Sequence, residues 1–249
     1  MNFIINIDNL ICKVDLDRGH DISIPLHPGI RQVNCFYAPL YQHEPVRMGN
    51  FIGSIESGSP VNFYNVKLNP HGNGTHTESS AHISSEGLSV NQVLTKYLFA
   101  AELLSVYPTH RENGDLVIEA ATIAALWQNR GVKALIVRTL PNDDSKITRQ
   151  YSGTNPQYFS PEAIDLIVEN GIQHLLVDLP SVDKEEDQGL LASHKSFWKG
   201  DRSRHCTITE LIYVKNEITD GFYLLNLQLA PIELDASPSR PVIYPLNLV

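Results

Sequence analysis

The chain has 249 residues, of which 42% are hydrophobic and 19% are charged, a length that allows one large domain or two small ones. Its formal net charge of −9 leaves no basic patch for a nucleic-acid backbone, and its apolar runs are too short to span a membrane. With nucleic acid and membrane excluded, a small molecule is the expected partner.

The first part of the chain, residues 1–58, is the hardest to assign, because prolines and glycines break it repeatedly. Four aromatic residues gather there: Phe36, Tyr37, Tyr41 and Phe51. They either cover one edge of the core or roof a ligand pocket, since loops on a rigid scaffold commonly carry specificity.

The N-terminus and the cysteines both point to a reducing compartment. The sequence MNFIINIDNL lacks the basic and long apolar regions of a secretory signal, which favours a cytoplasmic location. Cys12, Cys35 and Cys206 are odd in number and far apart, as is typical of reduced, structural thiols.

The next segments alternate between helical and strand patterns. Residues 61–68 form a predicted strand that leads into a histidine-rich stretch, and the later elements follow it in chain order. They are a helix from Val90 capped by Ser89, a strand at 103–108, a helix at 119–129, a strand at 134–138, a helix from Ser160 to Gly171, a strand at 173–178, strands at 208–214 and 221–229, and a closing segment at 241–248. Helix, strand, helix, strand indicates an α/β fold, and the lack of linkers or repeats indicates one domain over 1–249.

The histidine-rich stretch at 69–83 reads NPHGNGTHTESSAHI. If 75–83 is extended, His76, Glu78 and His82 share one face because side chains alternate along a strand. His71 has the wrong parity, but a bulge at the nearby glycines could turn it towards the others. These residue types suit a divalent metal or the base and acid of a hydrolytic site. The alternative is that the histidines are only hydrogen-bonded in a polar loop.

Later candidates lie at the carboxyl end of an apolar strand and beyond it. Asp178 ends the strand at 173–178, Asp183 follows it, and His194 lies in a loop with glycine and serine nearby. Glu210 stands within the apolar segment ITELIYV, where a metal or a basic partner would offset the cost of burying its charge. His205 is ambiguous, and the remaining histidines lack neighbouring ligands: His20, His27, His43, His110 and His174.

Taken together, these motifs resemble the cyclase family, which includes bacterial kynurenine formamidases (arylformamidases) and isatin hydrolases. The family signature runs His-x-Gly-Thr-His-x-Asp-x-Pro-x-His, and here Gly74-Thr75-His76 and His82 match its spacing. The resemblance covers most of residues 60–249 and continues through LIVRT (135–139), FSPEAIDLIVENGI (159–172), VDLPSVD (177–183), His194, TELIYV (209–214) and PIELDASPSRPV (231–242).

The resemblance implies a single-domain swivelling β/β/α-type fold with a mixed central sheet and flanking helices, assembled as a homodimer or homotetramer. It also implies a site with one or two metals. By position, the metal ligands would be His71, His76, Glu78, His194 and Glu210, and the catalytic acid/base would be His82. The family's first histidine falls at Gly72 in this chain, Glu78 replaces an Asp, and Ser80 replaces a Pro.

The function expected from this pattern is hydrolysis of a small amide, formamide or lactam, as in arylformamidase. Zn²⁺, or alternatively Mn²⁺, would activate water while His82 passes a proton to the leaving amine. Two other functions stay open: a metal-poor binding protein on the same scaffold, and a metal-dependent lyase or cyclase.

Overall fold

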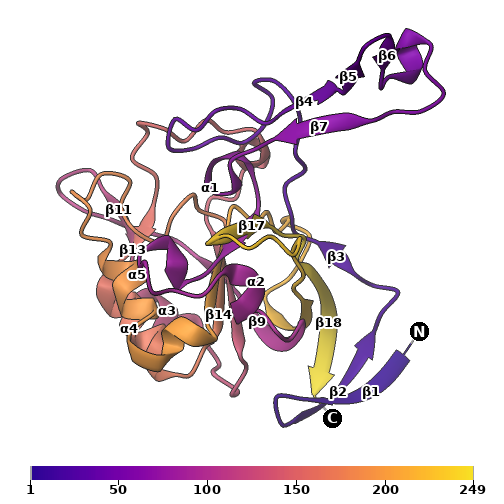
Figure 1. The fold of residues 1–249 in the computed structure, drawn as a ribbon. Helices are drawn as coiled ribbons and strands as arrows, with labels where there is room; N and C mark the ends of the chain where they lie inside the picture. Colours follow the sequence, from indigo (N-terminus) through magenta and orange to yellow (C-terminus); the bar gives the residue numbers. More distant parts are fainter. Residues whose placement is uncertain (1, 249) are drawn as a thin grey trace.

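A large mixed sheet runs through the molecule (Figure 1). The computed structural model describes residues 2–248, so the two end residues of the predicted 1–249 domain lie outside the described residues. The path of the sheet, from edge to edge, is β1 (Asn2–Ile7), β2 (Leu10–Asp15), β18 (Val242–Leu248), β16 (Gly221–Asn226), β9 (Leu98–Val106), β12 (Ala134–Thr139), β14 (His174–Val177), β15 (Thr207–Glu210), β8 (His76–Glu78) and β17 (Ala236–Pro238). A further strand, β3 (His20–Asp21), pairs with β18.

The middle of the sheet is parallel and its flanks are antiparallel. Strands β9, β12, β14 and β15 run parallel to one another, whereas β16 and β8 pair antiparallel to the ends of this block. The predicted α/β class with a mixed central sheet is confirmed.

The helices are few and short. The three largest lie together beside the sheet (Figure 1): α3 (Ala120–Leu126), α4 (Pro161–Glu169) and α5 (Ala192–Phe197). The short helical turns are α1 (Pro70–Asn73), α2 (Val90–Val93), η1 (Ile55–Ser57), η2 (Ser80–His82), η3 (Asp144–Ile147) and η4 (Gly200–Arg204). In the described residues no helix is long and apolar enough to cross a membrane.

The core lies on both faces of the parallel strands, which explains their continuous apolar runs. In β12, Leu135 and Val137 pack towards the helices with residues such as Ile164 of α4. Ile136 points to the opposite face and packs with Leu225 of β16. This alternation buries both sides of β12, as the sequence ALIVR predicts.

Several predicted elements are shorter than their sequence patterns indicate. The predicted helix from Val90 ends after one turn, although Ser89 caps it as expected and also forms a capping box with Gln92. The predicted strand at 208–214 stops at Glu210, because Leu211 adopts a positive φ of 54°. The predicted helix at 160–171 is confirmed as α4, with the Ser160 hydroxyl accepting a hydrogen bond from the Ala163 amide.

In the described residues, one small sheet and a projecting arm complete the fold. The small sheet contains β10 (Thr109–His110), β11 (Leu116–Ile118) and β13 (Tyr158–Phe159). The arm, residues 42–67, consists of β4 (Gln42–Pro45) paired with β7 (Tyr64–Lys67) and β5 (Arg47–Met48) paired with β6 (Phe51–Ile52). It extends away from the body at the top of Figure 1.

Candidate metal centre

Strand β8 supplies the buried middle of the histidine cluster. His76 and Glu78 lie two residues apart on it and share a face, as predicted, and both side chains are fully buried. Strand β15 pairs with β8 so that Glu210 lies opposite His76. This register brings Glu210 Oε2 to 3.4 Å from His76 Nε2, as expected for a directly opposed pair in an antiparallel ladder.

His71 reaches the cluster from a helical turn and not from the predicted bulge. The Asn69 side chain caps α1 by accepting a hydrogen bond from the Gly72 amide at 2.9 Å, and Pro70 occupies the first helical position. This turn places His71 Nδ1 at 3.2 Å from Glu78 Oε2. The prediction of a bulge was wrong, because the Asn-Pro pair starts a helix.

His82 also lies in the cluster, but not on an extended strand. The predicted strand at 75–83 ends at Glu78, and Ser79 caps the short η2 turn that carries His82. The His82 ring centroid is 4.3 Å from that of His71 and 5.5 Å from that of His194.

His194 comes from helix α5. Asp183 accepts hydrogen bonds from the Ser193 and His194 amides at 2.7 and 3.1 Å and so fixes the start of this helix. The same carboxylate lies 2.6 Å from His194 Nδ1. The other ring nitrogen, Nε2, lies 3.0 Å from Glu78 Oε1 and 3.9 Å from Glu210 Oε1.

Asp235 joins the centre although sequence reasoning did not select it. Its Oδ2 is 2.8 Å from His71 Nε2 and 3.3 Å from His82 Nδ1. The signal available in the sequence was weak: a carboxylate in the segment PIELDASPSRPV, which resembles the family but has no ligand spacing of its own.

The donor atoms fit a divalent metal. Three sets of side chains each bring their ligand atoms within 4.8 Å of one another: His71, His76 and Glu78; His71, His82 and Asp235; and Glu78, His82 and His194. Bonds of 2.0–2.2 Å from nitrogen and oxygen to zinc would place neighbouring ligand atoms about 3.4 Å apart. The nitrogen–oxygen distances of 3.0–3.4 Å around Glu78 and Glu210 agree with that spacing.

Within the described residues, two buried atoms of this cluster make no hydrogen bond: His76 Nε2 and Glu78 Oε2. Each has only an ion-pair contact, His76 Nε2 with Glu210 Oε2 at 3.4 Å and Glu78 Oε2 with His71 Nδ1 at 3.2 Å. Leaving such groups unpaired in the protein interior costs free energy, so a native site normally offers them a partner. Because both face other metal-binding side chains, a bound cation is the partner that their chemistry suits.

The cluster concentrates negative charge. Its carboxylates are Glu78, Asp183, Glu210 and Asp235. In residues 2–248 no lysine or arginine forms an ion pair with any of them. Among the described residues, their only partners in ion pairs are histidines.

The negative charge of these carboxylates changes the pKa of two histidines in the cluster. Burial opposes a charge on His71, but its close contacts with the carboxylates of Asp235 and Glu78 outweigh burial and raise its pKa to about 10. The same balance, with Asp183 and Glu78 as partners, raises the pKa of His194 to about 10. Conversely, close contacts with the imidazoles of His194 and His71 overcome burial and lower the pKa of Glu78. A divalent cation would compensate the same charge and release these protons on binding.

Three residues that the sequence analysis considered, Asp178, His174 and His205, lie outside the metal centre. Asp178 is buried against Lys146, 2.7 Å from its Nζ, and accepts hydrogen bonds from Thr139. His174 is buried beside Phe99, and His205 is exposed. As predicted, the three cysteines are unpaired, and all are buried.

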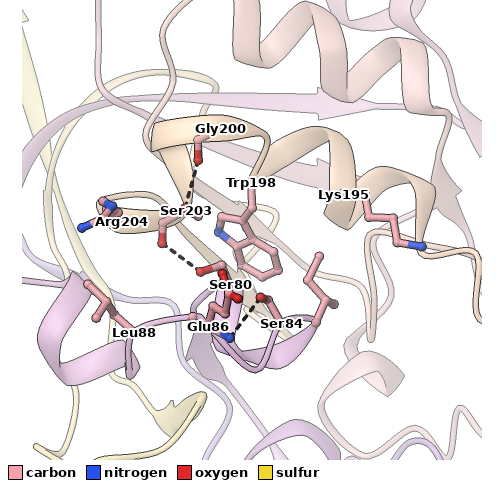
Figure 2. A pocket seen from close by; sticks show the side chains of 11 residues that line it. Ser80, Ser84, Glu86, Leu88, Lys195, Trp198, Gly200, Ser203 and Arg204 are labelled. Atoms are coloured by element: carbon pink, nitrogen blue, oxygen red, sulfur yellow. Dashed lines mark hydrogen bonds between the residues drawn. The ribbon is translucent and has the colours of Figure 1, made fainter.

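A cavity of about 420 Å³ adjoins the centre without including its ligands (Figure 2). Ser80, on the same η2 turn as His82, and Trp198 both line it, and the Ser80 hydroxyl donates to the Ser203 carbonyl at 2.8 Å. The Trp198 ring also lies 5.4 Å from the ring of His194. The cavity and the centre therefore share a wall.

Comparison with known proteins gives the family. The Cyclase family model matches residues 20–184, well over half of the chain. This chain belongs to the Cyclase family. The matched part contains His71, His76, Glu78, His82 and Asp183, whereas His194, Glu210 and Asp235 lie beyond it.

Solved structures share the fold of this Cyclase-family chain at low sequence identity. Isatin hydrolase A from Labrenzia aggregata superposes with a TM-score of 0.65 and 16% identity, over 91% of this chain and 93% of its own. Isatin hydrolase A from Ralstonia solanacearum gives 0.65 and 17%, over 91% of each chain. A predicted metal-dependent hydrolase from Bacillus stearothermophilus gives 0.62 and 14%, over 91% and 98%. These likenesses establish a common fold.

Proposed function

We propose that this chain is a metal-dependent hydrolase of a small amide, formamide or lactam. The observation that carries the proposal is a pair of buried atoms, His76 Nε2 and Glu78 Oε2, that make no hydrogen bond among the described residues and lie inside a cluster of imidazoles and carboxylates. Membership of the Cyclase family and the fold shared with isatin hydrolases support it.

In this proposal His76, Glu78, His194 and Glu210 hold the metal, and His71 is a further ligand. Zinc is the first choice because imidazoles make up much of the donor set, and the share of carboxylates makes manganese the alternative. When bound, the metal lowers the pKa of a water towards neutrality and polarises the substrate carbonyl.

His82 is the acid/base of the proposed reaction. Its side chain is 30% exposed, more than those of His76 and His194, so substrate can approach it from solvent. Its Nδ1 bonds to Asp235, and no hydrogen bond from residues 2–248 occupies its Nε2. His82 takes a proton from the attacking water and gives it to the leaving amine nitrogen.

The arm supports a further part of the proposal, that the chain forms a homodimer or homotetramer. Apolar side chains on it are more than half exposed, among them Met48, Phe63 and Val66. A second copy of the chain is the partner that we propose for this surface.

The enzymatic proposal is tested by assaying protein loaded with Zn²⁺ or Mn²⁺ against three substrates. These are N-formylkynurenine, an aryl formamide and isatin, the last because isatin is a cyclic amide. At least one is expected to be hydrolysed, with one water oxygen incorporated into the product. His82→Ala should lower kcat by about 10²–10⁴-fold, the usual contribution of general acid–base catalysis. His110→Ala, which changes an exposed histidine outside the cluster, should have no effect.

Failure of the metal-loaded protein to hydrolyse any amide would contradict the proposal. A product formed without incorporation of water oxygen would favour a lyase or cyclase instead. Stoichiometric metal that is lost in His76→Ala would rule out a metal-poor binding protein.

A further inference from the structure

Three imidazoles of the cluster, those of His71, His76 and His194, do not all turn the same ring nitrogen towards its centre. His194 turns Nε2 inward, 3.0 Å from Glu78 Oε1, and Asp183 holds its Nδ1 at 2.6 Å. His76 likewise turns Nε2 inward towards Glu210, and the Gly74 carbonyl holds its Nδ1 at 3.0 Å.

His71 is reversed. Its Nδ1 faces Glu78 Oε2 at 3.2 Å, and its Nε2 faces outward to Asp235 at 2.8 Å. Each of the three rings therefore has one nitrogen towards the centre and the other on an oxygen atom. That arrangement is the usual one for metal-binding histidines, whose second nitrogen donates to a carbonyl or carboxylate.

The backbone explains the reversal. A Cβ on Gly72 would lie 2.2 Å from the Ala38 Cβ and 3.1 Å from the Cys35 carbonyl oxygen, so position 72 has no room for a side chain. The histidine next to the centre therefore comes from position 71, one residue earlier on the α1 turn, and approaches from a different direction.

We propose that Asp235 is a positioning residue that makes His71 a ligand through Nδ1. An ionised carboxylate only accepts hydrogen bonds, so the Asp235 contact places the His71 proton on Nε2 and leaves Nδ1 free to bind a metal. The inference rests on the metal centre of the proposed function and adds a residue that the family match at 20–184 does not contain.

Asp235 itself is held firmly. Its backbone carbonyl accepts a hydrogen bond from the Ser79 amide at 2.9 Å, and the Leu234 carbonyl accepts one from the Val90 amide at 2.9 Å. It directly precedes β17, which pairs with β8. The carboxylate is therefore fixed relative to the strand that carries His76 and Glu78.

The same oxygen, Oδ2, also lies 3.3 Å from His82 Nδ1. Asp235 consequently places the proton of His82 on Nδ1 and leaves His82 Nε2 free for the proposed proton transfer. One carboxylate thus positions both a metal ligand and the acid/base.

The test measures zinc affinity by competition with a chromophoric chelator, independently of activity. Asp235→Ala should weaken zinc binding by about 10–100-fold, the usual effect of removing such a partner. Asp235→Asn, which retains an acceptor oxygen, should recover part of that loss. Glu233→Gln is the matched control: its carboxylate, two residues away, bonds only to Ser89 and Asn91 in the described structure, and its affinity should equal that of the wild type.

A purely structural role for Asp235 is separated by two further measurements. In a His71→Ala background, adding Asp235→Ala should leave zinc affinity unchanged, because Asp235 acts on the metal through His71. In the zinc-loaded wild type, ¹⁵N spectra should show His71 protonated on Nε2 and His76 and His194 protonated on Nδ1.

The outcomes distinguish this inference from the proposed function. If the wild type binds zinc and Asp235→Ala binds it equally well, or if His71 is protonated on Nδ1, the role of Asp235 is refuted and the metal centre stands. If the wild type binds neither zinc nor manganese, the metal centre itself is refuted, and the Asp235 inference with it.

Discussion

Gly72 illustrates how a single missing side chain shapes the centre. The α1 turn passes so close to Ala38 and Cys35 that only glycine fits at position 72, and His71 takes the place beside Glu78. The sequence showed the displaced histidine, but not the crowding that accounts for it.

Gly72→Ala is expected to lower the free energy of unfolding by about 1–3 kcal/mol, since an added methyl group must displace its neighbours. Urea denaturation of the metal-free protein measures this. The double variant Gly72→Ala/Ala38→Gly should recover part of the loss, because it removes the 2.2 Å contact but leaves the Cys35 carbonyl at 3.1 Å. Wild-type stability in the single variant would show that α1 can move away without cost.

At the residue scale, sequence patterns located the side chains that are close together in the chain. The alternation of His76 and Glu78 followed from strand geometry alone. Asp235 could not be found this way, because it lies 164 residues from His71 and is brought there only by the pairing of β17 with β8.

At the element scale, the predicted types were mostly right and the boundaries were not. The apolar run at 134–138 and the Ser160–Pro161 start of α4 carry their own local signals, and both elements formed as predicted. The prediction of an extended segment at 75–83 was wrong because the Ser79 side chain caps a turn. It accepts a hydrogen bond from the Ala81 amide, and this bond competes with strand formation. His82 nevertheless reaches the cluster, now through η2.

The pairing of β14 with β15 contains a buried histidine with a predictable pH dependence. His174 Nδ1 lies 2.9 Å from the Thr207 hydroxyl, and burial, reinforced by the charges of His205 and Arg202, lowers the pKa of His174 to about 3. The unfolded chain binds a proton near pH 6.5 that the folded chain does not. The stability that His174 contributes is therefore present above pH 6.5 and is lost as the pH falls from 6.5 towards 3.

Between pH 7 and pH 5 this loss amounts to about 2 kcal/mol, since each pKa unit corresponds to about 1.4 kcal/mol. The free energy of unfolding should therefore fall by about 2 kcal/mol more in the wild type than in His174→Gln over that interval. Urea titrations of both proteins at the two pH values measure the difference. Equal falls would mean that His174 is protonated in the folded state.

At the scale of the whole molecule, the arm is the feature that the sequence described least well. Within the arm the sequence predicts only the strand at 61–68, and nothing in residues 42–67 shows that their paired strands extend beyond the body (Figure 1). Apolar residues are exposed along it, including Val61, Phe63 and Val66, each more than half accessible.

We expect the arm to mediate self-association, so the mass of the wild type in solution should be two or four times the chain mass of 27.8 kDa. Burying a side chain such as Phe63 contributes about 2 kcal/mol, so Phe63→Ser/Val66→Ser should shift the protein towards the monomer. Tyr107→Ser, which changes an exposed aromatic residue outside the arm, is the control. Size-exclusion chromatography with light scattering measures the masses, and a monomeric wild type would contradict the expectation.

Anomalous diffraction is the most direct test of the proposed metal centre. Crystals of the protein grown with Zn²⁺ are measured on both sides of the zinc absorption edge. We expect an anomalous peak within bonding distance of His76 Nε2 and Glu78, and loss of that peak in His76→Ala. An ordered cluster without a peak would contradict the proposed metal centre.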